Sequence, residues 1–177
     1  MNLSSELCHK QILFEEKPLL SYDNAADYQA WKQSIRKKFH EVLGQMPERV
    51  PLNLNIEYDE KKEKYREIKF VFDSEKHSSV PGYLLIPNDV KLPCPVFICL
   101  QGHSMGMHMS LGRPKFPNDE RAIDRTNIAI QAINHGYAAL VIEQRGMGIR
   151  RSHNRCDFSA FTALILGRTL IGERVWD

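Results

Sequence analysis

Long apolar runs, a surplus of one charge and paired cysteines are all missing from this sequence of 177 residues. No apolar run approaches the roughly 18 residues that a membrane-spanning helix requires. Lysine and arginine together number 24, against 22 aspartates and glutamates, so the composition gives no support to nucleic-acid or membrane-surface binding. We therefore expect neither nucleic acid nor a membrane among the partners of this protein.

Cysteine is sparse, and its spacing matches no disulfide framework. Scattered thiols without a Cys-x-x-Cys pair are typical of a reducing compartment. The first 16 residues also lack the basic and apolar regions of a secretory signal, so we expect a cytoplasmic protein. The four cysteines are Cys8, Cys94, Cys99 and Cys156.

The amino-terminal part contains one clear amphipathic pattern. Residues 1–22 show no sustained period and are predicted to form an arm. Residues 23–43 carry an apolar stripe at helical spacing, and Gly44 stands where a left-handed C-cap is expected. We therefore divide the chain into residues 1–50, an arm followed by an amphipathic helix, and residues 51–177, the core.

Apolar strands and helices alternate through the core. Residues 65–72 and 80–86 are extended runs joined by polar turn residues, which predicts an antiparallel hairpin. Continuous apolar runs then predict two strands buried on both faces, each followed by a helix. This order predicts an α/β fold in which the hairpin leads into a parallel sheet flanked by helices. The predicted elements after the hairpin are a strand over 96–100, a helix over 118–135, a strand over 137–142 and a helix over 161–176.

The loop after the first buried strand contains a Gly-x-Ser-x-Gly pattern at residues 102–106. That pattern is the nucleophile elbow of α/β-hydrolases, and it would make Ser104 the nucleophile. An elbow needs a helix directly behind it, whereas Pro114 allows no more than about two helical turns here. The context therefore argues against the elbow.

A second interpretation of the same loop fits better. In α/β-hydrolases the loop after the third strand carries a His-Gly type motif whose backbone N–H donates to the oxyanion of the tetrahedral intermediate. Gln101, Gly102 and His103 occupy that place, with Gln101 where histidine is usual. Gly102 allows close backbone approach, and the N–H of His103 would donate. A well-aimed donor is worth ~3 kcal/mol of transition-state stabilisation.

Four segments, in this order, resemble the amino-terminal half of an acetyl xylan esterase or dienelactone-hydrolase-like α/β-hydrolase. The resemblance covers roughly residues 65–177. It implies a serine esterase that acts on small acyl esters, acetyl esters included, with a small-molecule ester as its partner and no cofactor. The segments are Gly82-Tyr-Leu-Leu-Ile-Pro87, Pro95-Val-Phe-Ile-Cys-Leu-Gln-Gly-His103, Gly136-Tyr-Ala-Ala-Leu-Val-Ile-Glu-Gln-Arg-Gly-Met-Gly148 and Gly167-Arg-Thr-Leu-Ile-Gly-Glu-Arg-Val-Trp-Asp177.

The resemblance also implies a gap. In that family the nucleophilic serine follows the strand after the Val-Trp-Asp segment, and the acid and the histidine come later. We therefore expect a fold truncated before the nucleophile strand, which supplies an oxyanion donor but no Ser-Asp-His triad. An open sheet edge would then favour self-association.

The loop after the second buried strand resembles the family's acidic-x-Arg-Gly-x-Gly loop, whose charged side chains usually brace neighbouring loops. We expect the same structural role for Glu143, Arg145, Gly146 and Gly148.

Other residues of the first loop receive weaker interpretations. We assign Gln101 and Met105 to substrate binding, because alternating methionines line an apolar acyl pocket or pack in the core. His103, His108 and Glu143 have no metal-ligand spacing, so no metal site is expected.

Two alternatives remain open. One is a non-catalytic pseudoenzyme or interaction fragment. The other is a minimal hydrolase that uses Ser104 as nucleophile, with His153 and Asp157 to complete a triad.

Overall fold

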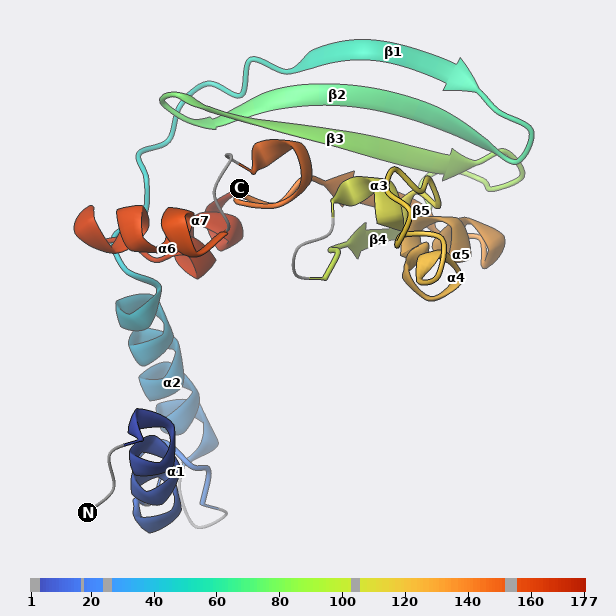
Figure 1. Cartoon of the computed structure of the whole chain (residues 1–177). Helices are drawn as coiled ribbons and strands as arrows, with labels where there is room; N and C mark the ends of the chain where they lie inside the picture. Colours follow the sequence, from blue (N-terminus) through green and yellow to red (C-terminus); the bar gives the residue numbers. More distant parts are fainter. Residues whose placement is uncertain (1–3, 17, 24–26, 103–105, 152–155) are drawn as a thin grey trace. The chain divides into compact units, whose positions relative to one another are not determined.

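The chain forms two compact units, Met1–Val42 and Leu43–Asp177, in a computed structural model (Figure 1). Within the residues that the structure describes, no helix has the length and apolar character needed to cross a membrane. The described residues are 4–16, 18–23, 27–102, 106–151 and 156–177.

The first unit contains two helices. α1 spans Ser5–Glu15, where only an arm was predicted, and the Ser4 hydroxyl accepts a hydrogen bond from the Leu7 N–H at its start. The prediction of an irregular arm was wrong. α1 buries no residue, and its sequence shows no apolar stripe from which a helix could have been predicted. α2 spans Tyr28–Leu43 and confirms the predicted amphipathic helix, although it begins later than expected.

The second unit is built on a five-stranded mixed sheet with the order β1-β2-β3-β5-β4. β1, β2, β3 and β5 pair antiparallel in turn, and β5 pairs with β4 in parallel. The predicted fold class, a hairpin leading into a parallel sheet with flanking helices, is confirmed. The strands are β1 (Asn55–Lys61), β2 (Tyr65–Glu75), β3 (Ser78–Pro87), β4 (Val96–Cys99) and β5 (Ala138–Ile142).

Two strand predictions need correction. β1 was missed because it is rich in charged residues and buries none of them. β4 was predicted to be buried on both faces, yet Val96, Phe97 and Ile98 are each more than half exposed and only Cys99 is buried. β4 lies at the edge of the sheet, and a continuous apolar run cannot tell an edge strand from a central one.

Three short helices connect β4 to β5 where one loop and one long helix were predicted. The expected helix over 118–135 is divided at Asn127, whose backbone (φ −75°, ψ 47°) leaves the helical region. α5 packs against β3, β4 and β5, and it buries Ala129, Ala132 and Ile133 in the core. The helices are α3 (Met107–Ser110), α4 (Ile123–Thr126) and α5 (Ile128–Asn134).

The last predicted helix, over 161–176, is also two helices: α6 (Cys156–Ile165) and α7 (Leu170–Trp176). The chain turns between them at Gly167, whose φ of +70° suits glycine. Thr169 then caps α7, because its hydroxyl accepts a hydrogen bond from the Gly172 N–H and donates one to the Leu43 carbonyl. Figure 1 draws α6 and α7 next to each other.

Candidate functional site

The two loops singled out in the sequence begin side by side. β4 and β5 are parallel neighbours in which Cys99 pairs with Val141, so Gln101 and Glu143 leave the sheet at the same edge. Carboxyl ends of parallel strands are where α/β proteins assemble their sites. A short 3₁₀ helix, η1 (Gly148–Arg150), follows the loop after β5.

Glu143 connects the two loops through its buried carboxylate, which is 1% exposed. Its Oε1 accepts hydrogen bonds from the Gln101 side chain at 2.8 Å and from the Met107 backbone N–H at 3.0 Å. Its Oε2 accepts from the Ile149 N–H at 3.2 Å. The Gln144 side chain donates to the Gln101 carbonyl at 2.8 Å. The loop after β4 is therefore held at both of its ends by residues that follow β5.

The glycine at position 148 makes room for this carboxylate. A Cβ on Gly148 would lie 2.1 Å from Glu143 Oε2, so the buried carboxylate would have to move out of its present position. Gly102 differs, since it is exposed and a Cβ there would meet nothing within 4 Å. Among the described residues, nothing therefore blocks the approach of a ligand to the backbone at Gly102.

Several predicted site residues lie outside the described residues. They include His103, the expected oxyanion donor, and Ser104, the alternative nucleophile. Met105, assigned to substrate binding, and His153, from the alternative triad, lie there too. Gln101, the other substrate-binding assignment, is buried with its side-chain amide on Glu143.

The neighbouring methionines, Met107 and Met109, are buried, so the core alternative holds for these two residues. Among the described residues, no three histidine, cysteine, aspartate or glutamate side chains converge as metal ligands.

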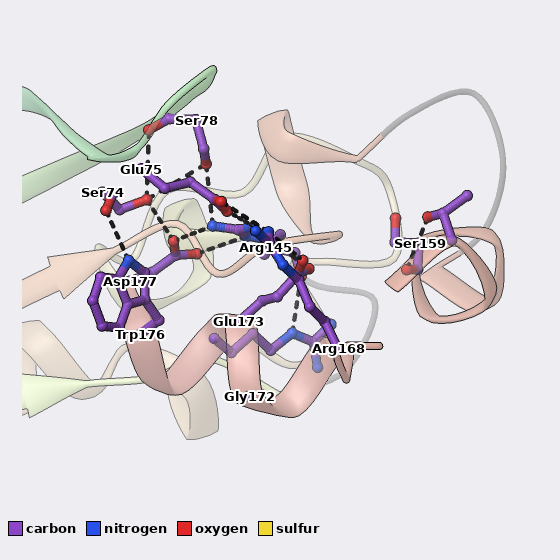
Figure 2. A network of polar contacts seen from close by, with 12 residues as sticks. Ser74, Glu75, Ser78, Arg145, Ser159, Arg168, Gly172, Glu173, Trp176 and Asp177 are labelled. Atoms are coloured by element: carbon purple, nitrogen blue, oxygen red, sulfur yellow. Dashed lines mark hydrogen bonds and ion pairs between the residues drawn. The ribbon is translucent and has the colours of Figure 1, made fainter. Parts of the chain in front are cut away.

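Arg145, which was expected to brace neighbouring loops, lies at the centre of a network of ion pairs whose other members the sequence did not identify (Figure 2). Its guanidinium donates to Glu75 Oε1 and to Asp177 Oδ1, each at 2.5 Å. Arg150 donates to Asp177 Oδ2 at 2.6 Å, and the Ser74 hydroxyl donates to Asp177 Oδ1 at 2.7 Å. The network therefore joins the end of β2 to the loop after β5 and to the end of α7.

Further contacts extend the network along α7. Arg168 donates to Glu75 Oε2 at 2.8 Å and contacts Glu173 at 3.4 Å. Arg174 donates to the Arg145 carbonyl at 2.8 Å, and the Trp176 indole N–H donates to the Ser74 carbonyl at 2.7 Å. Figure 2 shows these side chains converging from three separate parts of the chain.

Two carboxylates of the network, those of Asp177 and Glu75, hold their charge. Burial raises the pKa of Asp177, but hydrogen bonds from Arg145 and Arg150 outweigh burial and bring that pKa below its usual value. The pKa of Glu75 is lowered in the same way, because Arg145 and Arg168 outweigh its desolvation. A carboxylate whose pKa is lowered and whose oxygens already accept hydrogen bonds from arginines is a poor general acid or base near neutral pH. The network is suited to holding structure rather than to acid–base chemistry.

The antiparallel meander, the parallel β4–β5 pair and the linked loops at its carboxyl edge define a protein of the α/β-hydrolase class. The chain belongs to the Abhydrolase family, whose Abhydrolase_7 sequence profile matches residues 2–171. The presumed hydrolase YtaP of Bacillus subtilis (strain 168) is 24% identical over 143 residues, which cover 80% of this chain and 46% of YtaP.

A solved structure extends the similarity in fold. The crystal structure of a presumed acetyl xylan esterase from Bacteroides fragilis NCTC 9343 matches with a TM-score of 0.79 at 19% identity. The match covers 99% of this chain and 48% of that protein. The chain therefore spans about half the length of the relatives that it matches.

Proposed function

We propose that this chain is the amino-terminal part of a serine esterase that hydrolyses acetyl esters or similar small acyl esters. It contributes the oxyanion-hole loop, and the Ser-Asp-His triad comes from residues outside these 177. Membership of the Abhydrolase family supports the hydrolase class. The acyl group is suggested by the Bacteroides fragilis relative, which is itself described as a presumed acetyl xylan esterase.

The observation that carries this proposal is the double attachment of the loop after β4 to Glu143. An oxyanion hole works when its donors are already aimed before the substrate arrives, because no reorganisation is then needed during the reaction. Glu143 holds both Gln101 and Met107, which flank the expected donor, and Gly102 leaves the backbone accessible. We assign Glu143 and Gln144 as positioning residues for this loop.

The mechanism follows from that arrangement. Serine attack on the ester carbonyl moves an electron pair onto the carbonyl oxygen, and the N–H of His103 donates to the resulting oxyanion. The oxyanion collapses to an acyl-enzyme and releases the alcohol, and water then releases the acid. Arg145 takes no part in these steps and keeps the loop after β5 in place.

Two substitutions at one position of the complete enzyme test the backbone donor. His103→Pro removes the N–H, whereas His103→Ala keeps it and removes only the side chain. We expect kcat on p-nitrophenyl acetate to fall about 10²–10³-fold for His103→Pro. The His103→Ala enzyme should stay close to wild type.

Equal kcat values for the two variants would contradict the donor role, provided that circular dichroism melting shows both to be folded. A loss that appears only in KM would also contradict it, since an oxyanion donor acts in the transition state.

Exposed apolar side chains favour a second candidate, a non-catalytic fragment that associates through its open sheet edge. Phe97 and Ile98 on β4 are more than half exposed, and so are Phe161, Leu164 and Ile165 on α6. An edge strand with exposed apolar side chains is a template for pairing with another chain. We propose a second copy of this chain as the partner. No observation in the described part of the chain favours a minimal hydrolase built on Ser104.

A further inference from the structure

A pocket next to the loop after β4 contains a histidine–carboxylate pair that the esterase proposal does not use. It lies between the start of α3, the segment before α4 and the 3₁₀ helix η1. Its lining combines an aromatic ring, two cations and one carboxylate with backbone. The lining residues are Gly106, His108, Lys115, Phe116, Asp119, Gly148, Ile149 and Arg151.

Asp119 determines which nitrogen of His108 carries the proton. Asp119 Oδ2 accepts backbone N–H bonds from Lys115 and Phe116, each at 2.9 Å, and lies 2.9 Å from His108 Nε2. These hydrogen bonds, the one from Lys115 first, keep the pKa of Asp119 below its usual value. Because Asp119 is a pure acceptor when ionised, Nε2 must donate to it. The lone pair of neutral His108 is therefore on Nδ1.

The His108 ring is held in a fixed position with Nδ1 accessible. Its side chain is only 7% exposed, and the Phe116 ring meets it edge-on with centroids 6.0 Å apart. Nδ1 lies against Gly106, where an added Cβ would come within 2.7 Å. Among the described residues Nδ1 has no hydrogen-bond partner, and His108 is one of the residues that line the pocket. It can therefore meet a ligand in the pocket.

The charge of the pocket is positive. Lys115 and Arg151 are exposed and form no ion pair with any described residue. The Asp119 carboxylate, in contrast, already takes part in three hydrogen bonds, with His108, Lys115 and Phe116. The Glu143 carboxylate, which lies beside Gly148 of the lining, is buried and bonded to Gln101, Met107 and Ile149. Two cations that have no ion-pair partner in the described part of the chain, next to an imidazole that can gain a proton, are typical of oxyanion recognition.

We infer that this pocket binds a small oxyanion, either a planar carboxylate or a tetrahedral anion, and that His108 takes up a proton as the anion binds. Protonation turns Nδ1 from an acceptor into a donor while Nε2 keeps its bond to Asp119. An anion beside the ring favours the imidazolium over the neutral imidazole, so its affinity should fall as pH rises. This inference does not depend on the esterase proposal.

Calorimetric titration of the 177-residue chain with sodium acetate and with sodium sulfate tests the inference. Both anions stay ionised from about pH 6 to about pH 8, the range in which histidine titrates. We expect saturable binding that weakens by up to about tenfold per pH unit. Tighter binding of acetate would identify a carboxylate site, and tighter binding of sulfate a tetrahedral-anion site. Either result supports an oxyanion pocket.

Exposed residues provide variants that leave the fold intact. Arg151→Ala should weaken binding about tenfold, and Lys115→Ala should weaken it as well. Arg36→Ala removes another exposed arginine, on α2, and should leave anion binding unchanged. In the ¹⁵N spectrum of the wild-type protein, the His108 Nδ1 resonance should move to its protonated position when the anion is added.

Three results would overturn the inference. One is that neither anion binds at tens of millimolar. Another is binding that Arg36→Ala weakens as much as Arg151→Ala does, which would indicate non-specific attraction. The third is saturable binding with no pH dependence and no change at Nδ1.

Discussion

The buried carboxylate of Glu143 accepts three hydrogen bonds, so even a small change to this side chain should destabilise the fold. Glu143→Gln replaces one acceptor oxygen by a donor that faces N–H groups. We expect a loss of about 1–3 kcal/mol in the free energy of unfolding, measured by urea denaturation. The exposed Glu48→Gln is the matched control and should change it by less than about 0.5 kcal/mol. A Glu143→Gln protein as stable as wild type would show that the carboxylate does not hold the loop.

Asp177 should make the free energy of unfolding depend on pH in the acidic range. The pKa of Asp177 is lower in the folded than in the unfolded protein. Ionised Asp177 therefore stabilises the fold fully above the ordinary carboxyl pKa of about 4. This contribution is lost as the pH falls through the lower pKa of the folded state. Asp177→Asn leaves Arg145 and Arg150 without a shared carboxylate, which should cost about 3 kcal/mol near neutral pH. The variant should also lose stability less steeply in acid.

Urea denaturation of both proteins between neutral pH and acid checks this prediction. Asp89→Asn, at an exposed aspartate, should reproduce the wild-type profile. Parallel profiles for wild type and Asp177→Asn would contradict the ion-pair account.

At the scale of elements, α7 depends on a close approach to the chain at Leu43. A Cβ at Gly172 would lie 2.1 Å from the Leu43 carbonyl oxygen. Gly172→Ala should therefore force α7 away and cost about 1–3 kcal/mol of unfolding free energy. Gly102→Ala is the matched control, because its Cβ meets nothing within 4 Å. If both variants unfold at the same urea concentration, the close approach is not needed.

The element pattern was predictable wherever apolar residues form a helical stripe or an extended run. The stripe of α2, the strands β2 and β3 and the apolar β5 were all visible in the sequence. β1 and α1 were not, because neither buries a residue. Helix breaks at Asn127 and Gly167 depend on local backbone geometry that periodicity does not report.

The site was partly predictable for a similar reason. Loops that follow parallel strands are easily located, so Gln101 and Glu143 were found together. The partners of Arg145 were missed because Glu75 and Asp177 are 70 and 32 residues away in the chain. The His108–Asp119 pair was missed because the segment that carries Asp119 folds back within a loop, where no period links the two residues.

At the scale of the whole molecule, apolar surface is left uncovered along β4 and α6. Patches of this kind promote association, so size-exclusion chromatography with light scattering should detect dimers or larger species that increase with concentration. Ile98→Lys places a charge on the exposed edge strand and should shift the protein towards monomer. Leu19→Lys, at a fully exposed site in the first unit, is the control. A clean wild-type monomer at high concentration would contradict edge pairing.

The most direct test of the central claim is turnover of p-nitrophenyl acetate by the purified 177-residue chain, with Ser104→Ala measured in parallel. We expect no saturable turnover that is sensitive to serine-directed reagents, and identical rates for the two proteins, because the proposed function assigns the attacking serine to residues outside these 177. Saturable turnover that Ser104→Ala abolishes would contradict the account and make Ser104 the nucleophile.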